Sequence, residues 1–319
     1  MAAARSVVNR PAPYSAGITQ SSFCPGVSML NAAAIAKPIM AARPKFTRAQ
    51  AAGPELATVS SAEETRDKYT LIKRPGKSRY EVAPGMQWEF FTAGAQALTR
   101  FGSAAFVSGN LSNFRARPAK PIELYEFEGC PFCRKVREAV TILDIDAIFY
   151  PCPQGGPTYR PKAKELSGKS QFPFMIDPNT GTSMLESDDI IKYLFDKYGD
   201  GNIPLPLQLG AVTTLTAGIG LAPRMGAGSR YRAAKKPDKI LELWAYEASP
   251  FCKLVREKLV ELELPHLYHS VARNSPKRKE LTDKWNTDFQ VPYLEDPNTG
   301  TALFETDDIN KYLERTYAL

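Results

Sequence analysis

Two cysteines, Cys130 and Cys133, enclose the tetrapeptide Cys-Pro-Phe-Cys. A short run with strand character precedes this motif, and a helical pattern begins directly after it. Cys130 is therefore expected at a helix N-terminus, where unpaired N–H groups and the helix dipole stabilise a thiolate. We expect Arg134, Lys135 and Arg137 to add positive charge there. Such a thiolate forms mixed disulfides, and Cys133 is placed to resolve them.

Zinc sites use the same spacing, but they need a second pair of Cys or His ligands. The surrounding segment contains no His, and its one further thiol is Cys152, so no metal is expected. Cys152 lies between two prolines and is interpreted as a structural thiol, with a regulatory disulfide as the alternative. The chain's 5 cysteines are too few for a disulfide scaffold in 319 residues.

The motif belongs to a segment that occurs twice. Glu123-Leu124 recurs as Glu242-Leu243, 119 positions later. Further matched segments are Pro131-Phe132-Cys133 with Pro250-Phe251-Cys252, Val136-Arg137-Glu138 with Val255-Arg256-Glu257, and the Asp-Pro-Asn-Thr-Gly-Thr segments at 177–182 and 296–301. We term residues 118–200 copy 1 and residues 237–319 copy 2. Two units with so long a period exclude a solenoid.

Each copy predicts alternating strands and helices. Apolar runs with β-character predict the strands, and apolar residues at i, i+3, i+4 and i+7 predict the first helix. Asp-Pro-Asn-Thr-Gly predicts a hairpin, and Ser187 and Thr306 are suitable N-caps for the last helix. The order β-α-β-α-β-β-α is that of a thioredoxin-like domain, so the predicted fold is α/β with two such domains in tandem. The predicted strands cover 122–127, 147–150 and 172–176 in copy 1, and 240–246, 267–269 and 291–294 in copy 2.

Two further features of each copy point to binding of a peptide thiol. In thioredoxin-like folds the proline before the third strand, here Pro173 and Pro292, is commonly cis and faces the active cysteine; the alternative is an ordinary edge-strand proline. Glu186-Ser187 and Glu305-Thr306 begin the last helices. A helix N-terminus binds carboxylates and an adjacent acid binds an ammonium, as the γ-glutamyl end of glutathione requires; simple N-capping is the alternative.

Copy 2 departs from copy 1 at the nucleophile. Ser249 replaces Cys130, while Cys252 remains in the resolving position. A serine hydroxyl needs far more activation than a helix dipole supplies. We therefore expect a binding or scaffold domain, and a surface or core role for His266 and His269, which have no counterparts in copy 1.

The charge of the chain is concentrated at its N-terminus. The chain carries a net charge of +7, but residues 1–54 hold six basic side chains and no acidic one, so the remainder is close to neutral. Nucleic-acid binding is therefore not expected. An Ala- and Ser-rich segment without acids or a long apolar core predicts an organelle transit peptide over residues 1–60.

Two Gly- and Ala-rich segments precede the copies. They lie within a lead-in at 61–117 and an inter-domain segment at 201–236, and residues 201–223 carry no charged side chain. Prolines and polar residues argue against a membrane span there. A packed or membrane-surface segment, with peripheral membrane contact, is expected instead.

Three segments of copy 1 together resemble the glutathione S-transferase N-terminal domain, in its glutaredoxin-like branch. They are Cys-Pro-Phe-Cys-Arg-Lys-Val-Arg-Glu, Phe-Pro-Phe-Met-Ile-Asp-Pro-Asn-Thr-Gly and Glu-Ser-Asp-Asp-Ile-Ile. The tandem arrangement resembles plastid thioredoxin-family proteins of plants and algae. The resemblance implies a chloroplast destination, in the stroma or at the thylakoid, and glutathione as co-substrate. It implies that Cys130 is the glutathione-reactive thiol and Cys133 its partner. The implied glutathione contacts are Phe132, Phe172, Pro173, Glu186 and Ser187, with a degenerate second site at Ser249, Cys252, Val291, Pro292, Glu305 and Thr306.

The sequence thus predicts a glutathione-dependent thiol–disulfide oxidoreductase acting on protein disulfides or glutathionylated proteins. Classical transferase activity is not expected, because neither copy is followed by the helical domain that supplies the electrophile pocket. A non-catalytic glutathione- or protein-binding assembly module is the alternative. A glutathione-ligated iron–sulfur carrier is a third hypothesis, against which a resolving Cys133 argues.

Overall fold

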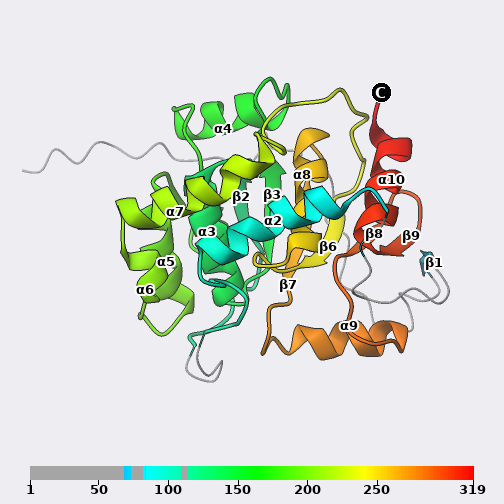
Figure 1. The fold of residues 1–319 in the computed structure, drawn as a ribbon. Helices are drawn as coiled ribbons and strands as arrows, with labels where there is room; N and C mark the ends of the chain where they lie inside the picture. The colour runs from blue at the N-terminus through cyan, green and yellow to red at the C-terminus, as the bar shows by residue number, and fades with distance from the viewer. Residues whose placement is uncertain (1–67, 73–81, 83, 109–113) are drawn as a thin grey trace, which may run out of the picture. The chain divides into compact units, whose positions relative to one another are not determined.

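The computed structural model describes residues 68–72, 82, 84–108 and 114–319 (Figure 1). The predicted transit peptide at 1–60 lies outside the described residues, which all belong to one unit, Ala51–Leu319. Each copy has the predicted order of elements, which confirms the α/β class and the tandem thioredoxin-like fold. Copy 1 comprises β2 (Ile122–Glu126), α3 (Pro131–Ile142), β3 (Ala147–Pro151), α4 (Tyr159–Ser167), β4 (Phe174–Asp177), β5 (Thr182–Met184) and α5 (Ser187–Tyr198). Copy 2 comprises β6 (Leu241–Ala245), α8 (Pro250–Glu261), β7 (His266–Ser270), α9 (Lys277–Trp285), β8 (Tyr293–Asp296), β9 (Thr301–Phe304) and α10 (Thr306–Tyr317).

The strands of both copies form one sheet with the order β1-β9-β8-β6-β7-β3-β2-β4-β5, in which β1 is Thr70–Ile72. The copies join where β3 pairs antiparallel with β7. Ile148 pairs with Leu267 at the centre, and these two residues occupy equivalent positions, 119 apart. The joint therefore has local two-fold symmetry, and each copy covers what would otherwise be an exposed strand edge of the other.

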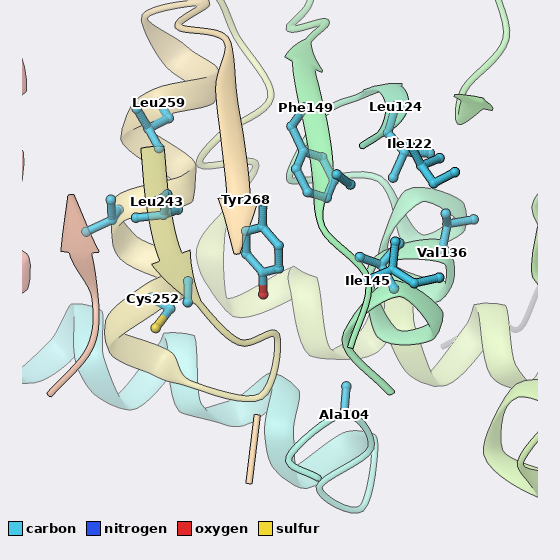
Figure 2. Close-up of a cluster of buried hydrophobic side chains, with 14 of the residues drawn as sticks. Ala104, Ile122, Leu124, Val136, Ile145, Phe149, Leu243, Cys252, Leu259 and Tyr268 are labelled. Atoms are coloured by element: carbon cyan, nitrogen blue, oxygen red, sulfur yellow. The ribbon is translucent and has the colours of Figure 1, made fainter. Parts of the chain in front are cut away.

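One hydrophobic core extends across this joint. It includes Leu124 and Val136 from copy 1 and Leu243 and Leu259 from copy 2. Figure 2 shows Phe149 and Tyr268 extending from the two central strands, and their rings meet edge to face with centroids 5.3 Å apart. The copies are thus packed as halves of one core.

Two lead-in helices pack over the joint. α2 (Gln87–Thr99) contacts α7 (Ala211–Leu221) and α8, while α7 contacts α3 (Figure 1). Their sequences repeat as well, because Thr92-Ala93-Gly94 with Arg100 recurs as Thr216-Ala217-Gly218 with Arg224. The two helices approach closely at Gly220, where a Cβ would lie 2.4 Å from Thr99 Oγ1 and 3.0 Å from Gln96 Cα. A side chain there would separate them.

The predicted inter-domain segment is built from three short elements. These are α6 (Leu205–Gln208), α7 and the 3₁₀ helix η3 (Ala222–Arg224). Among the described residues, no helix is both long and apolar enough to cross a membrane.

Candidate active site

Cys130 is the N-cap of α3, at the end of the turn that follows β2. Its Sγ accepts a hydrogen bond from the backbone N–H of Cys133 at 3.3 Å. Pro131 occupies the first helical position, where a missing N–H costs nothing. The pKa of Cys130 is lowered chiefly by hydrogen bonding from Cys133, through its thiol and its backbone N–H, while burial acts in the opposite direction. These contacts favour a thiolate at Cys130.

The pKa of Cys133 moves the other way. Burial raises it well above the ordinary value, and the hydrogen bond to Cys130 adds to that effect. Cys133 is 1% exposed, while its neighbour Phe132 is 48% exposed. The motif therefore holds one activated thiol and one protonated thiol, both buried, beside a half-exposed ring.

The basic residues after the motif are not free to act on Cys130 as the sequence suggested. Arg134 pairs with Glu138 at 3.0 Å, and Lys135 pairs with Asp188 at 2.5 Å. Arg137 lowers the Cys130 pKa only weakly, because it also pairs with Glu126 and Glu247. Hydrogen bonding at the helix N-terminus contributes more than these cations, which instead belong to a buried charge cluster.

This buried charge cluster joins the copies behind the motif. Arg137 of copy 1 lies 3.1 Å from Glu247 of copy 2, and Arg256 of copy 2 lies 3.2 Å from Glu128 of copy 1. The two contacts are equivalent under the 119-residue repeat. Burial raises the pKa of Glu126, at the edge of the cluster, to about 7, although Arg137 opposes the shift.

The peptide bond between Phe172 and Pro173, in the loop before β4, is cis. The Phe172 ring packs edge-on against Phe127, whose carbonyl accepts the Cys130 N–H at 3.2 Å. The Arg160 guanidinium lies 4.7 Å from the Phe172 ring centroid. The strand end, the cis-proline loop and a cation on α4 thus come together around Cys130.

The start of α5 is tied to the same region. Glu186 precedes the helix with a left-handed φ of 68°, and its carboxylate accepts a hydrogen bond from Gln171 Nε2 at 2.5 Å. Ser187 is buried, and Asp188 is the partner of Lys135 on α3. The structure therefore brings Glu186 and Ser187 to the motif side of the domain, with an acid and helix N–H groups side by side.

The N-cap of the first helix, the cis-proline loop and the start of the last helix together form what we term the frame. Copy 2 repeats this frame without the thiol. Ser249 caps α8, and its Oγ accepts from Cys252 N at 3.3 Å. Val291-Pro292 is cis, and Gln290 donates to Glu305. Thr306 Oγ1 donates to the Phe251 carbonyl at 3.1 Å. The Phe90 ring of α2 lies on the Phe251 ring with centroids 4.5 Å apart, so a lead-in helix covers this turn.

The remaining thiols and histidines are buried. No disulfide involves any of the four cysteines in the described part of the chain. Cys152 is fully buried, and burial raises its pKa well above the ordinary value. His266 stacks on Phe149, and His269 bridges Asp146 and Glu242 at 3.1 and 3.3 Å. Across the described ranges, no group of three or more His, Cys, Asp or Glu side chains is arranged to hold a metal ion.

The family model "Glutathione S-transferase, N-terminal domain" matches residues 124–202 and again residues 243–319. The two matches support two glutathione S-transferase N-terminal domains in tandem. No curated protein and no solved structure matches the chain. Domains of this family generally bind glutathione.

Sequence reasoning missed several residues of this frame in the two copies. Arg160 and Gln171 flank the site from α4 and from the loop before the cis-proline, and Phe90 covers the turn of copy 2. Glu126 and Glu247 belong to the buried charge cluster. The sequence of α2 recurs in α7 at an offset of 124 residues, so a comparison of the chain with itself at that offset identifies both lead-in helices. Phe90 then corresponds to Thr214 on α7.

Proposed function

We propose that the protein is a glutathione-dependent thiol–disulfide oxidoreductase that acts through Cys130. The observation that carries this proposal is the hydrogen bond from Cys133 N to Cys130 Sγ at the start of α3, together with a lowered Cys130 pKa. A thiolate is both the better nucleophile and the better leaving group in disulfide exchange. The match to a glutathione-binding family supports the choice of co-substrate.

In the first step, the Cys130 thiolate attacks the glutathione sulfur of a glutathionylated protein. The old S–S bond breaks, Cys130 becomes linked to glutathione, and the protein leaves as a thiolate that takes a proton from water. In the second step, a glutathione thiolate attacks the bound glutathione sulfur and releases glutathione disulfide. Cys130 returns as a thiolate, so the net reaction converts the glutathionylated protein and one glutathione thiol into a free protein thiol and glutathione disulfide.

We assign the second step to free glutathione because Cys133 is buried and its pKa is raised. Attack by Cys133 would instead form a Cys130–Cys133 disulfide, which two glutathione molecules would then reduce. In this account Phe172 and Pro173 present backbone to the cysteinyl part of glutathione, and Glu186 with Ser187 binds the γ-glutamyl end.

The test is to incubate the reduced full chain with glutathione disulfide and to map the added glutathione by mass spectrometry. We expect modification at Cys130, with Cys133→Ser retaining most of the turnover on a glutathionylated peptide. Glu186→Gln should raise KM for glutathione with little change in kcat. Modification spread over several cysteines, or none at Cys130, would contradict the proposal.

We propose that copy 2 is a non-catalytic partner domain. Ser249 supports this, as does the Phe90 ring over the Phe251 turn. We propose a plastid location from the composition of residues 1–54 and from the sequence resemblance. Import of the full chain fused to a fluorescent protein into chloroplasts, with loss of import on deletion of residues 1–60, tests the location.

A further inference from the structure

The outward side of the two lead-in helices is apolar. Trp88, Phe91 and Leu98 on α2, and Leu215 and Ile219 on α7, are between 54% and 77% exposed. We term this surface the apolar helix face. These five side chains expose on the order of 600 Å², at the upper limit of the about 300–600 Å² of the largest apolar patch on a typical monomer.

The polarity of α2 is inverted. A helix on a protein surface in water normally turns its apolar side inward. α2 instead buries Thr92 and Gln96, and its C-cap residue Arg100 is buried too. Arg100 pairs with Glu138 at 2.8 Å and donates to Thr216 of α7 at 2.8 Å.

The same anchoring recurs on the other side of the pair. Arg224 pairs with Glu257 at 2.6 Å and donates to Thr92 of α2 at 2.9 Å. Each helix is thus fixed to a copy and to the other helix by buried polar contacts. The apolar helix face is a fixed platform and does not result from loose packing.

The backbone after each helix presents one more apolar side chain. Phe101 follows Arg100 with φ 51°, and Met225 follows Arg224 with φ 50°. Bulky residues rarely adopt this left-handed conformation. The two side chains are 91% and 94% exposed and occupy equivalent positions in the lead-in repeat. Two costly backbone conformations therefore hold two large apolar groups in the solvent.

We propose that the apolar helix face binds the surface of a lipid bilayer, with α2 and α7 lying in its interfacial layer. Residues 201–223 carry no charge, and one carboxylate oxygen of Glu89, the single ionisable group of α2, is buried. The backbone N–H and C=O groups of the two helices are hydrogen-bonded within the helices, so contact with lipid hydrocarbon would leave none of them unpaired. A protein partner would usually need about one hydrogen bond per 100–200 Å². Tryptophan and phenylalanine are typical of interfacial helices.

Vesicle flotation with the full chain tests this proposal. Pure phosphatidylcholine vesicles in high salt exclude electrostatic binding by the basic N-terminus. The variant Phe101→Asn/Met225→Asn removes both projecting side chains, and asparagine tolerates the left-handed backbone, so folding is preserved. We expect on the order of 100-fold weaker partitioning, since each large apolar side chain contributes more than about tenfold. Leu319→Asn, at an exposed leucine outside the face, is the matched control and should leave partitioning unchanged.

Trp88 provides a second readout. Brominated phosphatidylcholine should quench its fluorescence, and Trp88→Phe should remove most of the quenching, because Trp244 is buried and Trp285, on α9, packs against Tyr293. Absence of partitioning would overturn the proposal, as would partitioning that the double variant leaves unchanged. A lipid-free dimer in sedimentation that the double variant dissociates, without vesicle binding, would identify a second copy of the chain as the occupant and would also overturn it. None of these results depends on thiol exchange.

Discussion

Copies 1 and 2 hold the same frame around different atoms. In each copy an N-cap atom accepts the N–H of the cysteine three residues on at 3.3 Å, sulfur from Cys130 in copy 1 and oxygen from Ser249 in copy 2. Both keep a cis X–Pro bond and a glutamine-to-glutamate hydrogen bond before the last helix. The same contacts therefore form in both copies whether the N-cap is cysteine or serine, and the expected chemistry depends on the N-cap atom.

The surroundings of the two turns also differ. Phe132 is largely accessible, whereas the equivalent Phe251 is covered by Phe90 from α2. Thr214 stands on α7 where Phe90 stands on α2, 124 positions earlier. The lead-in helices therefore cover the phenylalanine of the turn in copy 2 and leave the equivalent ring in copy 1 exposed, while Cys130 and Ser249 are both buried.

The largest expected effect is the loss of exchange in Cys130→Ser. Copy 1 would then carry the hydroxyl of copy 2, and we expect reduction of a glutathionylated peptide to fall by roughly 10³-fold or more, as when a covalent nucleophile is removed. Cys252→Ser, at the buried thiol of copy 2, is the control and should retain the rate. Comparable losses in both variants would show that the copies do not differ in chemistry.

Glu247→Gln tests whether the copies fold as one unit. Glu247 lies 3.3, 3.1 and 2.8 Å from Arg134, Arg137 and Arg256, so its neutralisation removes one carboxylate partner from each of three buried cations. We expect a loss of about 3–5 kcal/mol in the free energy of unfolding, in a single denaturant transition.

The control for Glu247→Gln is Glu165→Gln, which removes an exposed ion pair with Lys162 and should cost less than about 1 kcal/mol. Separate transitions for the two copies, or equal costs for the two variants, would break the account of a shared cluster.

His269 gives the joint a pH dependence that has no counterpart at Tyr150, the equivalent position in copy 1. Burial alone would lower its pKa, but Asp146 and Glu242 raise it to about 9. Because the folded pKa exceeds the unfolded value, the stabilisation is complete below about pH 6.5 and is lost as the pH rises through 9. Titration of the unfolding free energy should show a loss of roughly 1–3 kcal/mol that His269→Gln abolishes. Parallel curves for the two proteins would refute this role.

The smallest expected effect concerns the cover over copy 2. Ser249→Cys restores the tetrapeptide, but we expect its thiol to react slowly with iodoacetamide because Phe90 packs on the turn. Adding Phe90→Ala should raise that rate by about tenfold, since thiol reactivity depends on access. Phe91→Ala, whose side chain points away from the turn to solvent, is the matched control. A fast Ser249→Cys thiol in the presence of Phe90 would show that the cover is not what separates the copies.

Much of this comparison is predictable from the sequence. The repeat predicts both domains, and Cys130, Pro173 and Glu186 follow from motif spacing, because local capping and turn chemistry determine where helices start. The pairing of β3 with β7 is not predictable in this way, since the exposed backbone of any edge strand can pair with that of another, and the sequence does not say which two strands meet.

The partners of the basic residues after the motif also depend on that joint. Arg137 was expected to act on the thiol, but Glu247, which neutralises it, lies 110 residues away in the sequence. The inverted polarity of α2 is likewise invisible until Arg100 is seen paired with Glu138.

The most direct test of the central claim is the thiolate pKa of Cys130, measured in the full chain from the pH dependence of its alkylation, with Cys130→Ser to identify the signal. We expect a value clearly below the free-thiol value of about 8.5, rising when Cys133→Ala removes the side-chain hydrogen bond to Cys130. A Cys130 pKa at or above about 8.5 would contradict this claim, because the contacts at the start of α3 would then leave the Cys130 thiol no more acidic than a free thiol.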